Sequence, residues 1–139
     1  MHKVELDVSA SSLEWSLDGK SLLMTFGGRN VSVLDMSKMS STSLKKDVAT
    51  VSIDINEKVG KCCFSPCGNY IAASVQGSTH NEGVIKLIST KDFSSKSLSS
   101  AYKFVCHTAP IRSIQFSNCG STFVTSSDDG LVGVWNTKN

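Results

Sequence analysis

Three residue types that together form hydrolase triads occur close to one another in the sequence: His107, Ser127 and Asp129. In such a triad the His takes the proton of the Ser hydroxyl, and the carboxylate orients the His. Ser127 has no G-x-S-x-G motif around it, the motif that exposes a nucleophilic Ser at a sharp turn. Because buried polar groups also satisfy one another inside folded domains, we interpret the three residues as structural and expect no enzyme.

The sequence offers little for a metal or a cofactor. His80 and Glu82 are possible zinc ligands, but two ligands make half a site. No Cys-x-x-Cys pair occurs, and no helix is expected after Gly27-Gly28, as a dinucleotide site would require. We therefore predict neither a metal nor a cofactor.

The cysteines point to a reducing compartment. Five are present, and an odd number with one adjacent pair is a poor disulfide framework. On a strand, Cys62 and Cys63 would face opposite sides. We expect free thiols in an intracellular protein. Residues 1–15 contain no apolar segment of the secretory type, and no apolar run is long enough to span a bilayer.

A repeated motif explains how such residues are positioned. Residues 13–19, 62–68 and 114–120 each contain an aromatic residue, a Ser, two further residues and a Gly, with the glycines 49 and 52 residues apart. We expect each aromatic side chain to be buried in the core and each Gly to form a tight turn. The aromatic residues are Trp15, Phe64 and Phe116, and the glycines are Gly19, Gly68 and Gly120.

Short β-rich segments recur around each motif. Each motif is preceded by one candidate strand (4–8, 48–53, 102–106) and followed by two more (22–26 and 31–34, 70–75 and 84–88, 122–126 and 131–135). Together with the motif itself, this predicts three antiparallel units of four strands, and no segment has a convincing helical period. We place the repeats at about 3–47, 48–100 and 101–139, with residues 132–135 expected in an inner, buried strand.

The third repeat resembles a WD40 repeat in residues 107–117 and 126–136, which end in Trp135-Asn136 where the family has Trp-Asp. The resemblance implies an all-β fold of β-propeller blades, with residues 1–139 forming one partial propeller. It also implies a buried hydrogen-bonded network of His107, Ser127, Asp129 and Trp135. In the first two repeats Leu34 and Ile88 replace the Trp, and Leu6 and Ile55 replace the His.

Three blades are too few for a closed ring, since propellers typically have about four to eight. Three ways of completing the propeller remain open. The chain is part of a longer protein, it pairs with a second copy, or it completes a ring with a different subunit.

Partner-binding positions are expected on the rim formed by loops between second and third strands. Residues 76–83 form an insertion there that contains His80, Asn81 and Glu82, and Arg29 and Arg112 are expected near the same rim. The Ser-rich connectors 36–46 and 89–100 are either solvated linkers or docking loops tuned by phosphorylation.

The overall charge favours neither nucleic acid nor membrane as a partner. The net charge is +2, and no cluster of Lys and Arg with exposed aromatic residues is present. We predict a non-catalytic scaffold or adaptor that binds other proteins in a multi-subunit assembly. An RNA- or membrane-associated propeller is the alternative, and an enzyme carried on a propeller ranks third.

Overall fold

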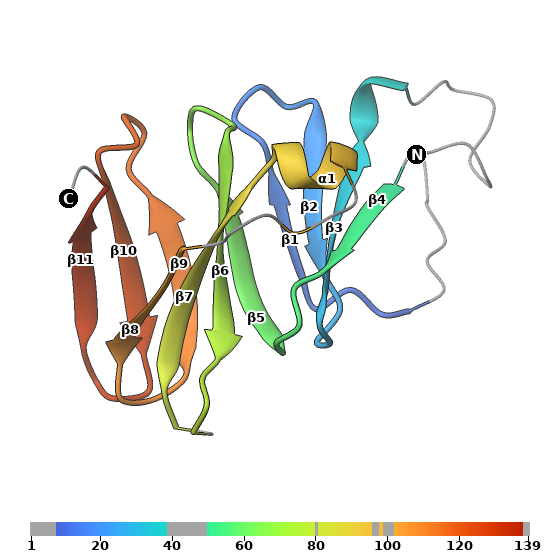
Figure 1. Cartoon of the computed structure of the whole chain (residues 1–139). Helices are drawn as coiled ribbons and strands as arrows, with labels where there is room; N and C mark the ends of the chain where they lie inside the picture. Colours follow the sequence, from blue (N-terminus) through green and yellow to red (C-terminus); the bar gives the residue numbers. More distant parts are fainter. Residues whose placement is uncertain (1–7, 39–49, 80, 96–97, 99–101, 138–139) are drawn as a thin grey trace.

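The computed structural model describes residues 8–38, 50–79, 81–95, 98 and 102–137. These residues form three antiparallel sheets that stand side by side in chain order (Figure 1). The first contains β1 (Ser12–Trp15), β2 (Ser21–Thr25), β3 (Asn30–Asp35) and β4 (Thr50–Asp54). The second contains β5 (Val59–Phe64), β6 (Tyr70–Gln76), β7 (Gly83–Ser89) and β8 (Tyr102–His107). The third contains β9 (Ile111–Phe116), β10 (Thr122–Ser127) and β11 (Val132–Asn136).

This arrangement confirms the predicted all-β fold of partial propeller blades, with one difference. The first two sheets have four strands, whereas the third has three within the described residues. The strand expected to lead each repeat pairs instead with the sheet before it, as β4 does with β3 and β8 with β7. The sheets are therefore offset by one strand from the sequence repeats. The candidate strand at 4–8 lies outside the described residues except for Val8, which forms a bend.

The same turn joins the first two strands of each sheet. In all three, a Ser hydroxyl accepts a hydrogen bond from a backbone N–H five residues later, at 2.9, 3.0 and 3.2 Å, in the pairs Ser16–Ser21, Ser65–Tyr70 and Ser117–Thr122. The Gly of each turn has a positive φ, between 68° and 73°. Because only Gly adopts this conformation without steric cost, the turn accounts for the Ser-x-x-Gly spacing found in the sequence.

The three motif aromatics occupy equivalent positions but are not equally buried. Trp15 pairs with Leu22, Phe64 with Ile71 and Phe116 with Phe123, which is the same register in each sheet. Phe64 and Phe116 are half-buried against the preceding sheet. The expected burial of Trp15 is wrong, since 53% of this residue is exposed. Its side chain lies on the outer face of the first sheet, where no other sheet packs in the described part of the chain.

Two apolar clusters hold the sheets together. One lies between the first and second sheets and includes Leu23, Ile53 and Ile71, and the other lies between the second and third sheets and includes Ile85 and Phe123. Cys62 belongs to the first cluster and Cys63 to the second, which confirms that the two thiols face opposite sides of β5. The second sheet is therefore apolar on both faces.

Two short helices modify the expectation for the connectors. A 3₁₀ helix spans Met36–Lys38, and α1 spans Lys91–Ser95. Phe93 of α1 is buried in the cluster between the first two sheets, and α1 contacts β4 and β7. Connector 89–100 is thus packed against the core at Phe93 and Leu98, and is not simply a solvated linker. Most of connector 36–46 lies outside the described residues.

The outer face of the third sheet is apolar and open. Val124, Val132 and Val134 lie on it, and the last two are each 71% exposed. The expectation that 132–135 form an inner, buried strand is therefore wrong for these valines. The reason is that β11 is buried only on the face that packs against the second sheet, through Trp135.

Candidate functional site

Four side chains between the second and third sheets form a closed polar network. Trp135 Nε1 donates to Thr125 Oγ1 at 2.8 Å, and Thr125 Oγ1 lies 2.7 Å from His107 Nε2. His107 Nδ1 lies 2.8 Å from Asp129 Oδ2. One assignment of protons satisfies all of these contacts: Thr125 donates to Nε2, and the protonated Nδ1 donates to the carboxylate. The hydroxyl proton is therefore committed to a structural hydrogen bond.

The hydroxyl of this network belongs to Thr125, and the assignment of Ser127 to that place is wrong. Ser127 Oγ donates to the carbonyl of Ala109 at 2.9 Å and accepts from the N–H of Asp129 at 3.3 Å. A β-bulge between Ser126 and Ser127 shifts the register at this end of β10. Ser127 therefore caps the loop that carries Asp129, whereas Thr125 meets His107 and Trp135.

Backbone geometry makes room for the network. Gly133 pairs with Thr125 across the sheet, and a Cβ atom at Gly133 would lie 2.5 Å from Trp135 Nε1 and 2.7 Å from Thr125 Oγ1. Only a residue without a side chain lets the indole lie over this point. His107, which is 4% exposed, meets the Trp135 ring edge-on at a centroid distance of 6.1 Å. The pairing of Thr125 with a Gly is the sequence signal that could have identified the hydroxyl.

Asp129 carries the charge of the network. Partial burial raises the pKa of its carboxyl, but the N–H of Leu131, His107 and the N–H of Thr108 outweigh this and lower the pKa overall. The ionised carboxylate thus orients the imidazole as well as the loop after β10. Every group of the Ser-His-Asp hypothesis has a structural partner here, which is how buried polar networks in proteins are usually arranged.

The loops that join β2 to β3, β6 to β7 and β8 to β9 lie at one edge of the three sheets, the lower edge in Figure 1. Arg29 makes two hydrogen bonds to Asp54 at 3.2 and 3.1 Å, and a third to Asn56 at 3.1 Å. Arg112 forms a bidentate ion pair with Asp128, which lowers the pKa of that carboxyl.

The remaining rim residues belong to the loop between β6 and β7. Asn81 is exposed and Glu82 is half-buried, whereas His80 lies outside the described residues. The structure therefore places Arg29, Asn81, Glu82 and Arg112 on a common edge, and each Arg is held by a neighbouring Asp.

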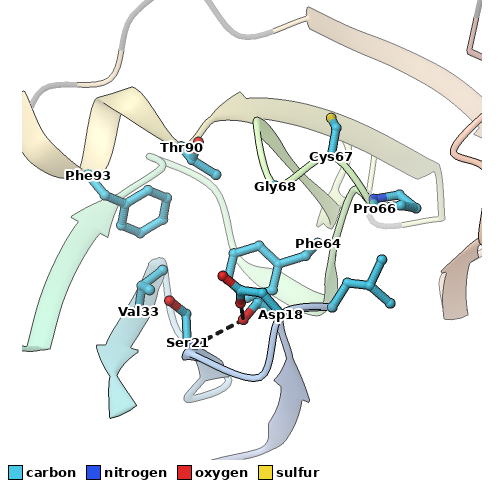
Figure 2. A pocket seen from close by; sticks show the side chains of 11 residues that line it. Asp18, Ser21, Val33, Phe64, Pro66, Cys67, Gly68, Thr90 and Phe93 are labelled. Carbon is cyan, nitrogen blue, oxygen red and sulfur yellow. Dashed lines mark hydrogen bonds between the residues drawn. The ribbon is translucent and has the colours of Figure 1, made fainter. Parts of the chain in front are cut away.

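A cavity that sequence reasoning missed lies at the opposite edge, between the first two sheets (Figure 2). It measures about 250 Å³ and is lined by two of the repeated turns, by Phe64 and by Phe93 of α1. Hydrogen bonds from the Ser16 hydroxyl and the N–H of Lys20 lower the pKa of Asp18 at its edge. Part of the cavity wall comes from α1, which has no helical signal in the sequence.

Neither a metal centre nor a membrane span is present in the part of the chain that the structure describes. No group of three or more His, Cys, Asp or Glu side chains gathers there, and no helix there is long and apolar enough to cross a bilayer.

Comparison with known proteins identifies the architecture. The WD40 family, described as "WD domain, G-beta repeat", matches residues 98–136. The mitotic checkpoint protein BUB3.1 of Arabidopsis thaliana is 27% identical over 133 residues, covering 89% of this chain and 36% of the relative. Apoptotic protease-activating factor 1 of Rattus norvegicus is 34% identical over 79 residues, covering 57% of this chain and 6% of the relative. The chain thus spans about a third of the length of the first relative and a small part of the second.

A solved structure shares the fold. A chain in the crystal structure of a mitotic checkpoint complex aligns with 99% of this chain at a TM-score of 0.71 and 16% identity, and this chain covers 40% of it. The blade topology, the register of the repeats and the match over the third repeat lead to one conclusion. Residues 98–136 match a WD40 repeat, and the chain has the fold of three consecutive blades of a β-propeller.

Proposed function

We propose that the protein is a non-catalytic scaffold that binds other proteins in a multi-subunit assembly. One observation carries the proposal. The residues that could have formed a hydrolase triad are hydrogen-bonded to structural partners, while charged and polar side chains project from one edge of the blades. Proteins that bind others through loops on a rigid scaffold are built in this way.

The named relatives support the same proposal. One is a mitotic checkpoint protein, and the solved structure is of a checkpoint complex. Those properties belong to these proteins, and they favour a role in an assembly for this chain. We also propose an intracellular location, supported by the five free cysteines.

We further propose that one more blade packs on the outer face of the first sheet and another on the outer face of the third sheet. Val124 and Val134 of the third sheet have the same register as Leu23 and Val33 of the first, which pack against the second sheet. Trp15 has the register of Phe64, which packs against the sheet before it. The open faces therefore carry the two halves of an interface between blades. A longer chain, a second copy or another subunit would supply the missing half.

Substitutions on the two edges of the blades test the scaffold function. The rim variant Arg29→Ala/Asn81→Ala/Arg112→Ala removes exposed side chains from the proposed edge. The control Lys20→Ala/Asn69→Ala/Asn118→Ala removes three exposed side chains from the opposite edge. The tagged protein is expressed at native level, and its stoichiometric partners are quantified by mass spectrometry after crosslinking.

We expect the rim variant to lose at least about tenfold in recovery of one or more partners, because few residues carry most of an interface's energy. The control variant should retain them, with the melting temperature of both unchanged. Equal recovery in the two variants, or a purified protein without stoichiometric partners, would contradict the proposal.

A further inference from the structure

A cavity lies between the second and third sheets, at the edge opposite the rim. It measures about 560 Å³, within the range of about 300–1,000 Å³ that is typical of small-molecule sites. Six apolar or aromatic side chains form its walls: Pro66, Tyr70, Leu87, Tyr102, Phe104 and Phe116. A second cavity of about 400 Å³ shares Leu87, Phe104 and Phe116 with it and extends toward Trp135. The two cavities therefore provide a continuous apolar surface.

Two thiols lie at this cavity. Cys67 and Cys119 both line it, and both are exposed. They occupy the same position in the repeated turns of adjacent sheets, just before Gly68 and Gly120. The turns approach each other closely, because a Cβ atom at Gly120 would lie 3.4 Å from Pro66 Cδ. In the first sheet this turn position holds Asp18, so a Cys is not required for the turn to form.

Hydrogen bonds favour the ionised form of both thiols. The Ser117 hydroxyl lies 3.4 Å from Cys119 Sγ and the Ser121 hydroxyl lies 2.9 Å from it, and these contacts lower the pKa of Cys119 to about 7. The Ser65 hydroxyl, at 3.3 Å, likewise lowers the pKa of Cys67. A thiolate is the nucleophilic form of Cys.

The other three cysteines have the opposite character. Burial raises the pKa of Cys62 and Cys63, and raises that of Cys106 to about 11. The two thiols with a lowered pKa are therefore the two in the turns that line the apolar cavity.

We propose that this cavity is a covalent binding site for small apolar α,β-unsaturated ketones and aldehydes, whose tails lie against the aromatic walls while Cys119 captures the reactive end. In the reaction, the thiolate sulfur forms a bond to the β-carbon of the ligand. The π electrons of the carbon–carbon double bond move to the α-carbon as an enolate, which takes a proton from water. The product is a thioether, with no leaving group and no oxidant.

The test compares two ketones with the same reactive group and different tails. Oct-1-en-3-one and but-3-en-2-one are each incubated at pH 7 with the full chain, and the rate of modification at every Cys is measured by peptide mass spectrometry. Glutathione treated in the same way gives the intrinsic rate ratio. Burying the longer tail should make the octenone-to-butenone ratio at Cys119 about tenfold greater than at glutathione. An equal ratio at Cys119 and glutathione would overturn the proposal.

Variants separate the cavity from the thiol. Tyr102 is 75% exposed, so Tyr102→Ser should leave folding unchanged while lowering the rate with octenone more than that with butenone. Val124→Ala, on the far face of the third sheet, is the matched control and should change neither rate. Cys119→Ser should abolish the fast reaction. Preferential capture of octenone at Cys67 in the unmodified chain would show that the assignment to Cys119 is wrong.

Discussion

The second and third sheets have the same framework but differ in how it is filled. Where the third sheet packs against the second, its Thr125 and Trp135 form a polar network with His107 of β8. By register, Thr125 corresponds to Ala73 of the second sheet, and Trp135 corresponds to Ile88. Both of these residues are fully buried, as is Ile55, which stands where His107 does. A blade therefore forms whether these positions hold polar or apolar side chains, because the two sheets share the same backbone pairing and the same repeated turn.

The second sheet has its own polar contact at the same place. Lys86 corresponds to Gly133, and its Nζ donates to the carbonyl of Ile55 at 2.8 Å. It also lies 3.4 Å from Glu57, which forms an ion pair with Lys103 as well. In the third sheet Gly133 leaves space for the indole of Trp135. In the second sheet the Lys86 side chain at the same position reaches the carbonyl of Ile55. The comparison indicates that the network of the third sheet stabilises that sheet and is not essential to the fold.

The largest effect is expected at the centre of the network. Thr125→Val keeps the shape of the side chain but leaves His107 Nε2 and Trp135 Nε1 without their partner. We expect the free energy of unfolding to fall by about 2–5 kcal/mol, the cost of two unsatisfied buried groups. Ser127→Ala is the matched control and should cost about 1 kcal/mol. Urea unfolding followed by Trp fluorescence measures the free energy of unfolding of both variants. Equal losses would mean that Ser127 belongs to the network.

A smaller effect separates two equivalent aromatic residues. Phe116→Ala should lower the free energy of unfolding by about 2–4 kcal/mol, since the ring is half-buried against the second sheet. Trp15→Ala should cost under about 1 kcal/mol in the dilute chain, because Trp15 is largely exposed.

Association extends the comparison of these two variants. If another blade covers the first sheet, Trp15→Ala should weaken self-association or binding of the completing partner, measured by sedimentation. Unchanged association would exclude this face from the interface.

The smallest effect concerns the ion pairs of the second sheet. Partial burial raises the pKa of Glu57, but Lys103 and Lys86 outweigh it, so the pKa in the folded chain is lowered. A lowered pKa stabilises the fold above the unfolded value of about 4.3, and this contribution disappears as the pH falls through the folded value.

Substitution of Glu57 isolates this contribution. Glu57→Gln should therefore cost under about 1 kcal/mol at pH 7 and nothing at pH 2, because Gln keeps the shape of the half-buried side chain and loses only its charge. Urea unfolding at a series of pH values measures the difference, and a loss that does not change with pH would assign it to packing.

Local patterns in the sequence predicted the strands and turns, because both depend on nearby residues. Gly19, Gly68 and Gly120 mark turns that need a positive φ, and the alternation at Cys62 and Cys63 places two thiols on opposite faces of one strand. The repeat register predicted which residues replace Trp135 in the other sheets. These features were accessible because a turn or a strand is specified within about ten residues.

Contacts between distant residues decided the rest. Thr125 rather than Ser127 joins the network because a bulge and the Gly133 gap, both set by pairing across the sheet, direct the two hydroxyls differently. Trp15 is exposed and Phe93 is buried for a related reason, since the burial of a side chain depends on which sheet or helix packs over it. The sequence by itself determined the repeated β-sheet unit, and the packing of the units against one another determined which polar groups meet and which apolar faces remain open.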